Sequence, residues 1–533
     1  MFPLFLAQPD AVWSIDMMQY NNPLQLKRMS ILLFLAACVA IALSYAVIGY
    51  LAYSKQQDML HPLPALFLMA FTLGPLLVGI GVAYMYGRYQ TALATLSQLD
   101  YSLEIVRSQT HIQGLEYLID RWRDFKPAAN ESDILHSHIL LLNSIIQLNY
   151  PPDSPIRILR YFPGNKIRGG IFLLAAAANT STVLKIDHLA NIEAEIQNYR
   201  AYVKPCLNRT PGEPDLPKQR HVYMDENSWG GIRYNLLDME DDHGSQVLSL
   251  ADYCQGHSPK EIAQALAQVF ESLAPWWDNR PRSKMLAQAA GQPAVALSNE
   301  YNRLYRYRAD IRDGIMAAAA TLNITSLQAI TRAQPCLQLT SELEVDNPLY
   351  WLEQSFNQSN FFSQLDQPGL RWDSIVHGDL HAHNILIGES NGHVHAWIID
   401  FPRVHLGPTV QDLARLEASL LAGMIDERCH GLSLENWLAF ITTLLPSSPT
   451  MSLAQLTPRE LPEDIPAKDQ LEAIRQVVLV LRAKAVHFTM GNDPRPYYLA
   501  LLYAALPMMK YRDLLPVQKL GLFLLAAVLC GRF

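Results

Sequence analysis

Residues 374–417 read SIVHGDLHAHNILIGESNGHVHAWIIDFPRVHLGPTVQDLARLE. A short run rich in β-branched residues, Ser374–Val376, enters a glycine turn, and a second apolar run begins at Ile385. A third run, Val394–Ile399, follows an Asn-Gly pair, and Asn-Gly between apolar runs is a β-hairpin signal. The pattern therefore predicts three short strands that hold one loop between them.

Three oxygen-bearing side chains fall at the ends of these runs. Asp379 lies in the loop, Asn384 at its exit, and Asp400 where the last strand stops. Phosphoryl transfer needs a carboxylate that orients the attacking hydroxyl and accepts its proton, and oxygen ligands for Mg²⁺. Asp379 suits the first task, and one amide with one carboxylate suits an ion that keeps several waters. A single Asp or Asn is more often a turn residue, but the joint spacing indicates a phosphotransferase that uses ATP and Mg²⁺.

The segments HGDLHAHNIL and IIDF resemble the catalytic loop and metal-binding strand end of aminoglycoside phosphotransferases and choline kinases. They resemble the corresponding protein kinase segments less closely. The resemblance implies an α+β fold, in which a β-rich lobe precedes a helical lobe. It makes Asp379 the catalytic base and Asn384 and Asp400 the metal ligands. His377 and His381 would then brace the loop by hydrogen bonds rather than bind metal.

Asp412 heads a predicted helix, QDLARLEASLL. In the family that this chain resembles, an Asp at this place is buried and steadies the loop. A first-turn carboxylate favoured by the helix dipole explains Asp412 equally well. Both interpretations stay open.

Residues 157–187 read as three strands joined by a glycine-bearing turn and a polar turn. Gly164, Gly169 and Gly170 would let the backbone approach phosphates closely, although any hairpin needs turn glycines. Lys185 lies within the apolar run VLKI, and a buried lysine costs free energy unless it is paired. The resemblance implies that Lys185 holds the α and β phosphates and pairs with a glutamate of the next helix.

That helix is predicted over Leu189–Val203. Glu193 and Glu195 lie about 200° apart on a helical wheel, so only one of them can face Lys185. Glu195 is favoured because its spacing to the tyrosine that follows resembles related sequences. Glu193 would then be a solvated surface residue.

A strand pair around a turn at 227–230 is expected next. Leu237 and Met239 follow it, where folds of this kind place the hinge that binds adenine through backbone groups. Asp238 and the acidic residues 240–242 fit an exposed loop, the commoner case, or an attraction for a cationic substrate.

Two uncharged apolar runs, Ile31–Tyr53 and Leu63–Tyr86, precede the kinase-like region. At about 1.5 Å per helical residue, each is long enough to span a bilayer, so a two-helix transmembrane hairpin is predicted. Lys27, Arg28 and Arg88 flank the pair, and positive flanks stay inside. Both termini and the kinase-like region are therefore expected in the cytoplasm, at a membrane such as a bacterial inner membrane.

Composition limits the other functions. The 533 residues are half apolar and carry a formal charge of −8, without a Lys/Arg cluster. Because nucleic acid binding depends on such clusters, nucleic acid is excluded as a main partner. The six cysteines are scattered without a C-x-x-C pair, which argues against a disulfide or zinc framework.

The remaining organisation follows from these segments. Residues 1–30 form a cytoplasmic segment, 88–126 a helical linker, 130–240 the first lobe and 241–533 the second. The apolar steps of the linker fit a helix packed on the chain's own kinase-like region or a coiled coil that forms a homodimer. The linker has fewer than three clean heptads, which favours a helix packed on the kinase-like region over a coiled coil.

Helices dominate the predicted second lobe. One starts at the capping box of Ser258 with Pro at its first position, and another covers 299–321. Leu514–Cys530 is apolar but contains Lys519, so a core helix is favoured over a third span.

Over 130–533 the chain more particularly resembles the bacterial ternary-complex-associated domains, which are predicted phosphotransferases. It shares their strand lysine, HGDLH loop, IDF segment and LE-containing helix. Two departures are a poor glycine turn, which puts the phosphate cover in doubt, and Pro402 in place of the glycine after Asp-Phe.

The sequence thus leads to one hypothesis: a membrane-anchored enzyme that transfers the γ-phosphate of ATP to a hydroxyl of a small molecule. The first alternative is a catalytically inactive nucleotide-binding module that signals at the membrane, which the poor glycine turn favours. The second is a protein kinase. The missing A-P-E segment and the H-G-D loop in place of H-R-D argue against the second alternative.

Overall fold

The computed structural model of the chain describes residues 112–113 and most of 131–533. The gaps within that range are chiefly 151–155, 163–169, 176–180, 206–211, 216–220, 236–246, 292–303, 358–371 and 446–460. The predicted segment 1–30 and the two predicted spans lie outside the described residues, as does the linker except for 112–113. Among the described helices, none combines the length and the apolar character that crossing a bilayer requires.

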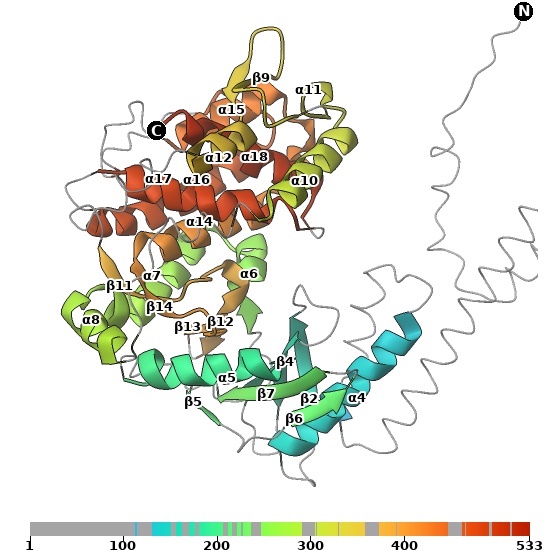
Figure 1. The fold of residues 1–533 in the computed structure, drawn as a ribbon, viewed down its shortest axis with the longest axis vertical. Helices are drawn as coiled ribbons and strands as arrows, with labels where there is room; N and C mark the ends of the chain where they lie inside the picture. The colour runs from blue at the N-terminus through green and yellow to red at the C-terminus, as the bar shows by residue number, and fades with distance from the viewer. Residues whose placement is uncertain are drawn as a thin grey trace, which may run out of the picture. The chain divides into compact units, whose positions relative to one another are not determined.

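The first lobe is built on a seven-stranded sheet (Figure 1). Its order is β1-β2-β3-β4-β7-β5, and β6 pairs with β7. The parallel pair is β1 with β2, and the other neighbours are antiparallel. The strand bounds are β1 Ile112–Gln113, β2 Ile156–Phe162, β3 Gly170–Ala175, β4 Ser181–His188, β5 Gly212–Asp215, β6 His221–Met224 and β7 Asn227–Asn235.

Strand β1 corrects the prediction of a continuous helix through the linker. Ile112 and Gln113 pair with Ile156 and Arg157 at the start of β2. A two-residue strand is too short to show a periodicity of its own, and the helical pattern on either side therefore concealed it.

The turn between β6 and β7 also differs from the prediction. Met224 pairs with Asn227, so the connection is the two residues 225–226. The expected turn residues 227–230 belong to β7, where Gly230 also pairs with Asp187 of β4. The Asn and Gly at the ends of 227–230 suggest a turn, whereas Gly230 permits close packing: a Cβ there would lie 3.2 Å from a methyl carbon of Leu189.

Two helical segments accompany this sheet. β4 runs directly into α5 (Leu189–Asn198), which continues as the π-helical turn η2 (Tyr199–Val203). The helix predicted over 189–203 is therefore confirmed, with a wider last turn. The other segment, α4 (Glu131–Asn149), is followed by Tyr150, whose hydroxyl lies 2.6 Å from Oγ1 of Thr182 in β4.

The second lobe is mainly helical, with short strands around the loop of residues 377–384. Its helices are α6 Leu250–Gly256, α7 Pro259–Trp277, α8 Arg280–Ala289, α10 Arg308–Thr321, α11 Thr325–Gln328, α12 Pro348–Asn357, η3 Ala382–Asn384, α14 Val410–Met424, η4 Glu427–Gly431, α15 Leu434–Thr443, α16 Lys468–Ala485, η6 Val486–Phe488, α17 Arg495–Met508 and α18 Pro516–Cys530. Its strands are β8 Leu248–Ser249, β9 Cys336–Gln338, β10 Glu344–Asp346, β11 Asp373–Val376, β12 Ile385–Ser390, β13 His393–Ile398 and β14 His405–Pro408.

The structure confirms the predicted start of one helix and moves the start of another. The Ser258 hydroxyl accepts a bond from the Glu261 backbone N–H, and the Glu261 carboxylate accepts one from the Ser258 backbone N–H, so the predicted capping box is confirmed. The helix expected over 299–321 begins only at Arg308, after a turn that ends at Tyr307. The segment Leu514–Cys530 contributes a buried core helix, as expected, although α18 begins only at Pro516.

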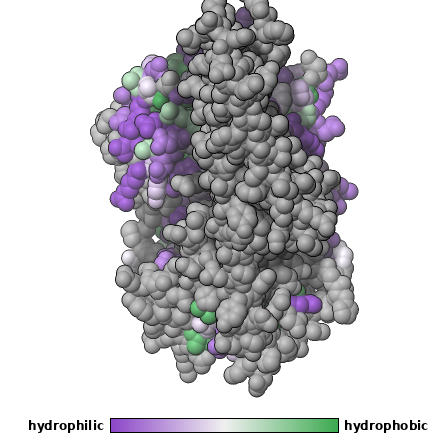
Figure 2. Space-filling view, turned by 90° about the vertical axis from the view of Figure 1, so that its right-hand side faces the viewer, coloured by the Kyte–Doolittle hydropathy of each residue, from purple (hydrophilic) through white to green (hydrophobic). Residues whose placement is uncertain are grey.

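Helix α14 is the centre of the helical lobe. It packs against α6, α16, α17 and α18, and nearly all of its residues are buried. The hydrophobic cluster around it extends into the first lobe through Phe401 and Tyr234. Side chains of described residues in the upper part of Figure 2 are mostly hydrophilic, as expected for the outer faces of helices that surround one apolar core. The predicted α+β class, a β-rich lobe before a helical lobe, is confirmed.

Candidate active site

Lys185 of β4 lies between two carboxylates that come from different parts of the chain. Its Nζ is 2.5 Å from Oε2 of Glu195 in α5 and 2.5 Å from Oδ1 of Asp400, which follows β13. The lysine and Glu195 are buried, and the Asp400 side chain is 26% exposed. Burial by itself would lower the pKa of Lys185, but the two carboxylates raise that pKa above its ordinary value.

Glu195 binds three donors at once. Besides Lys185, it accepts bonds from the Tyr234 hydroxyl of β7 and from the backbone N–H of Phe401, at 3.1 Å. The complete burial of Glu195 raises the pKa of its carboxyl. Glu193 lies exposed on the other side of α5, so the structure resolves the choice between the two glutamates. Sequence reasoning did not find Tyr234, because this residue lies far from Glu195 along the chain and no sequence pattern links the two.

The Asp-Phe-Pro segment is fixed in an unusual backbone conformation. Asp400 has a φ of +74°, a region that costs a non-glycine residue of order 1 kcal/mol or more and that clusters at functional sites. Next to it, the Phe401 ring packs between Tyr199, Tyr234 and Trp276. The Asn198 side chain donates bonds of 3.1 and 2.9 Å to the carbonyls of Phe401 and Pro402. Helix α5 therefore holds the backbone directly after Asp400 through the side chains of Glu195 and Asn198.

The loop after β11 turns sharply at Gly378. Its φ is +75°, and a Cβ there would lie 2.4 Å from the carbonyl oxygen of Arg403. The loop is also anchored by His377, whose Nε2 lies 2.9 Å from the carbonyl oxygen of Ile399. This bond ties the loop to the residue before Asp400, and it matches the bracing role expected for His377.

Replacing Gly378 by Ala should destabilise the protein by about 1–3 kcal/mol, because the new side chain meets both a strained φ and a backbone oxygen. Urea unfolding followed by tryptophan fluorescence measures this loss. Gly392→Ala is the matched control, since Gly392 has the same φ of +75° but open space around its Cβ position. A loss at Gly378 no larger than that at Gly392 would contradict the close approach of Arg403.

Three residues on one face of α14 hold the loop. Asp412 accepts bonds from the backbone N–H groups of His377 at 2.7 Å and Gly378 at 3.0 Å. Ser419 accepts one from Ala382 at 2.9 Å. Arg415 lies between them in the helical repeat and pairs with Asp379, at 3.1 Å. The buried Asp412 thus steadies the loop, the first of the two roles that the sequence left open.

Asp379 is bound by two guanidinium groups. Arg415 Nη2 is 3.1 Å from Oδ1, and Arg403 Nη1 is 3.1 Å from Oδ2. Burial would raise the pKa of Asp379, but Arg415, His381 and Arg403 hold it well below its usual range. Sequence reasoning missed both arginines. The spacing of Arg415, three residues after Asp412, could have revealed it, whereas Arg403 gave no signal.

Asn384 and Asp400 lie on neighbouring chain segments. Ile399 donates a backbone bond of 3.0 Å to the carbonyl of Asn384, which places Asp400 next to it. The amide nitrogen of Asn384 donates to the Asp379 carbonyl at 3.0 Å, so the amide oxygen is the atom with metal-binding chemistry. The described residues contain no group of three His, Cys, Asp or Glu side chains that could hold a metal. One amide and one carboxylate nevertheless fit Mg²⁺, which takes few protein ligands.

His381 is an unusual member of the loop. Burial lowers its pKa to about 4, and the imidazole is therefore neutral near pH 7. Its Nδ1 is buried and has no hydrogen-bond partner among the described residues. A neutral imidazole leaves Asp379 as the ionised group of this loop.

The predicted nucleotide contacts are described only in part. Gly164, Gly169, Leu237 and Met239 lie outside the described residues. Gly170 begins β3, where a Cβ would come within 2.4 Å of the Tyr161 ring, so packing alone already requires a glycine there.

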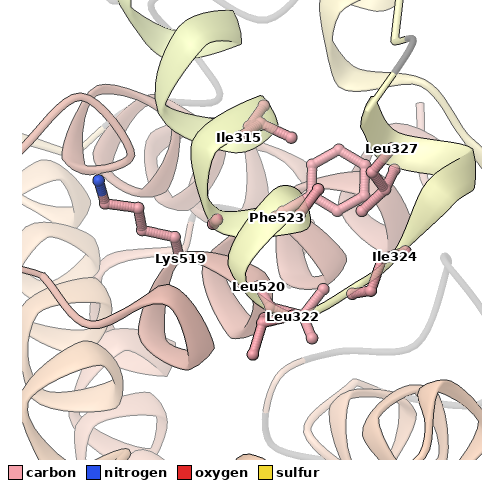
Figure 3. Close-up of a pocket in the computed structure, with 9 residues that line it drawn as sticks. Ile315, Leu322, Ile324, Leu327, Lys519, Leu520 and Phe523 are labelled. Atoms are coloured by element: carbon pink, nitrogen blue, oxygen red, sulfur yellow. The ribbon is translucent and has the colours of Figure 1, made fainter. Parts of the chain in front are cut away.

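A small apolar pocket lies apart from these residues, between α10, α11 and α18 (Figure 3). Ile315, Leu327 and Phe523 point into it, while Lys519 lies at its edge with its amine turned away. Its volume of about 10 Å³ is close to the minimum for one water molecule, which excludes it as a substrate site.

Residues 288–510 match the family model described as ternary complex associated domain 9. This range contains the loop of residues 377–384, the Asp-Phe-Pro segment and α14, and it confirms the resemblance to the ternary-complex-associated domains. The comparison with curated protein sequences finds no match.

Several solved structures are similar to this chain at low identity. One is an aminoglycoside 2'-phosphotransferase in complex with GDP, with 14% identity, 72% of this chain and 95% of that chain covered, and a TM-score of 0.36. A Plasmodium vivax ethanolamine kinase has 13% identity, with 75% of this chain and 88% of that chain covered and a TM-score of 0.32. A microcompartment-associated aminopropanol kinase has 12% identity, with 74% of this chain and 95% of that chain covered and a TM-score of 0.36. At such values the activity has to be inferred from the geometry of the site itself.

Proposed function

We propose that this chain is a membrane-anchored phosphotransferase, dependent on ATP and Mg²⁺, that transfers the γ-phosphate to a hydroxyl group of a small molecule. The observation that supports it most is the contact of Lys185 with both Glu195 and Asp400. A buried lysine that joins the two lobes in this way can bind phosphate oxygens when it exchanges Asp400 for them. The loop that carries Asp379 and Asn384 is bonded to the strand end beside it.

Each residue has a role in the proposed reaction. Lys185, positioned by Glu195, binds the α and β phosphates and gives up Asp400 to do so. Asp400 and the amide oxygen of Asn384 would hold the Mg²⁺, which neutralises charge on the phosphates. The acceptor hydroxyl bonds to the γ-phosphorus as the bond from that phosphorus to the bridging oxygen of ADP breaks. Asp379 orients the hydroxyl and takes its proton.

The nucleotide contacts outside the described residues belong to the same proposal. Gly164 and Gly169 would cover the phosphates together with Gly170, and Leu237 and Met239 would bind adenine through their backbone groups. His377 and His381 keep the loop in shape and do not bind the metal.

Replacing Asp400 by Ala should weaken the binding of Mg·ATP at least tenfold, because the remaining amide ligand cannot hold the ion alone. The fold should persist, since Lys185 keeps Glu195 as its partner. Calorimetry on the full-length protein measures the affinity. Asp426→Ala, which removes an exposed carboxylate paired to Arg428, is the control and should bind Mg·ATP like the wild type. Retained affinity in Asp400→Ala would contradict this metal site.

One observation favours the second candidate function, an inactive nucleotide-binding module. Both oxygens of the Asp379 carboxylate are engaged by arginines, so an acceptor hydroxyl would compete with a guanidinium at either oxygen in this state. Binding of Mg·ATP without hydrolysis or transfer to any hydroxyl compound would select this function.

The membrane anchor of the proposal is supported by the sequence. The uncharged runs 31–53 and 63–86 and their basic flanks favour a hairpin with the kinase-like region in the cytoplasm. The linker 88–126 would pack on that region or join two copies. A full-length protein that stays in solution when cell membranes are sedimented would contradict the anchor.

A further inference from the structure

The charges beside Asp379 are unusual for a site that accepts a hydroxyl. Two guanidinium groups face one carboxylate, so this side of the site carries an excess of one positive charge. The group around Lys185 carries the opposite excess, because one amine faces Glu195 and Asp400. The negative excess suits a metal ion, and the positive excess requires a different explanation.

The two arginines differ in how firmly they are held. Arg415 belongs to α14, donates through Nη1 to the carbonyl of Ala504 at 3.3 Å and bonds to Tyr511, and its side chain is only 16% exposed. The Arg403 side chain is 48% exposed, and its contact in the described part of the chain is with Asp379. Arg403 is therefore the arginine that can leave the carboxylate.

An acceptor hydroxyl needs one oxygen of Asp379. Displacing Arg403 supplies that oxygen, and it also leaves an unpaired guanidinium beside the bound acceptor. A guanidinium in this position binds planar or tetrahedral oxyanions through two parallel hydrogen bonds. An acceptor with its own negative group would thus replace the bond that Arg403 gives up.

We propose that the acceptor carries an anionic group, a phosphate or a carboxylate, and that Arg403 exchanges Asp379 for this group when the acceptor binds. The inference rests on the proposed function and names the substrate class of the same site. The contact between Arg403 and Asp379 is then a resting state, which the binding of an anionic acceptor breaks.

A cationic acceptor does not fit the described charges. Its positive group would lie beside two guanidinium groups, and like charges at such distances repel. The acidic residues 238 and 240–242, which would attract a cation, lie outside the described residues. The contacts of Asp379 therefore favour an anion.

The test uses the full-length protein saturated with Mg²⁺ and a non-hydrolysable ATP analogue, so that the γ-phosphate position is filled. Calorimetry then compares four probes of similar size: glycerol 3-phosphate and glycerate as the two kinds of anion, glycerol as the neutral compound and choline as the cation. At least one anion should bind at least tenfold more tightly than glycerol and choline. Which anion binds distinguishes phosphate from carboxylate.

Arg403→Gln should weaken the binding of that anion at least tenfold and leave the affinity for the ATP analogue unchanged. Arg428→Gln is the matched control, because it removes an exposed guanidinium that pairs with Asp426 in the turn after α14. This variant should bind both ligands like the wild type.

Three results would overturn the inference. The first is that choline binds more tightly than both anions, or that neither anion binds. The second is unchanged anion binding in Arg403→Gln. The third is loss of the ATP analogue in that variant, which would make Arg403 a ligand of the γ-phosphate. A wild type that does not bind the ATP analogue at all would refute the proposed function itself.

Discussion

Replacing Asp379 by Asn should lower the rate of phosphoryl transfer from Mg·ATP by about 10²–10⁴-fold, the usual contribution of a general base. An amide has nearly the same shape as the carboxylate but cannot take the proton of the acceptor. Affinity for Mg·ATP should stay within a factor of about three, since Asp379 is not one of the proposed metal ligands. Release of ADP measures the rate, with water or an anionic hydroxyl compound as acceptor.

This variant also removes the negative charge that faces Arg403 and Arg415. Its thermal unfolding is therefore recorded beside its activity, so that a folding defect is recognised. Asp426→Asn is the control, because it removes a carboxylate with an arginine partner at an exposed turn. If Asp379→Asn turned over ATP as fast as this control, Asp379 would not be the base.

The largest loss of stability is expected from Glu417→Gln. Glu417 and Arg482 are 1% and 0% exposed, and the Arg482 Nη2 and Nε atoms lie 2.5 and 2.9 Å from the Glu417 oxygens. The Tyr497 hydroxyl donates to the same carboxylate, so α14, α16 and α17 meet at this point. Burial by itself would lower the pKa of Arg482, but Glu417 raises it, and the arginine therefore stays charged.

Removing one partner of a buried ion pair leaves the other charge without compensation, which costs about 3–5 kcal/mol. Urea unfolding of Glu417→Gln should show a loss of this size. The double variant Glu417→Met with Arg482→Met should recover most of it, because both charges are then gone and apolar volume remains. A single variant that loses less than about 1 kcal/mol would show that Arg482 is not isolated from water.

The residues of the proposed reaction centre were the most predictable part of the candidate site. The order of Asp379, Asn384 and Asp400 follows from local spacing, and these residues lie on segments that the structure bonds together. Lys185 was found because a charged residue in an apolar run needs a partner, and a helical wheel left one of two glutamates to face it. The choice of Glu195 came from the resemblance of its spacing to related sequences.

Contacts between distant segments were not predictable in the same way. Arg403 and Tyr234 approach Asp379 and Glu195 through tertiary packing, which leaves no periodic pattern in the sequence. The same holds for β1, whose two residues form a strand only because β2 lies beside them. The prediction of a turn at 227–230 was wrong because these residues belong to β7, where Gly230 serves packing against α5.

The proposed function requires two oxygen ligands that share one divalent ion, and a structure of the full-length protein with Mg²⁺ and a non-hydrolysable ATP analogue tests this directly. It should show one ion about 2.0–2.1 Å from the amide oxygen of Asn384 and a carboxylate oxygen of Asp400, with Lys185 on the phosphates. An ion bound elsewhere, or a nucleotide that leaves Lys185 on Asp400, would contradict the proposed site.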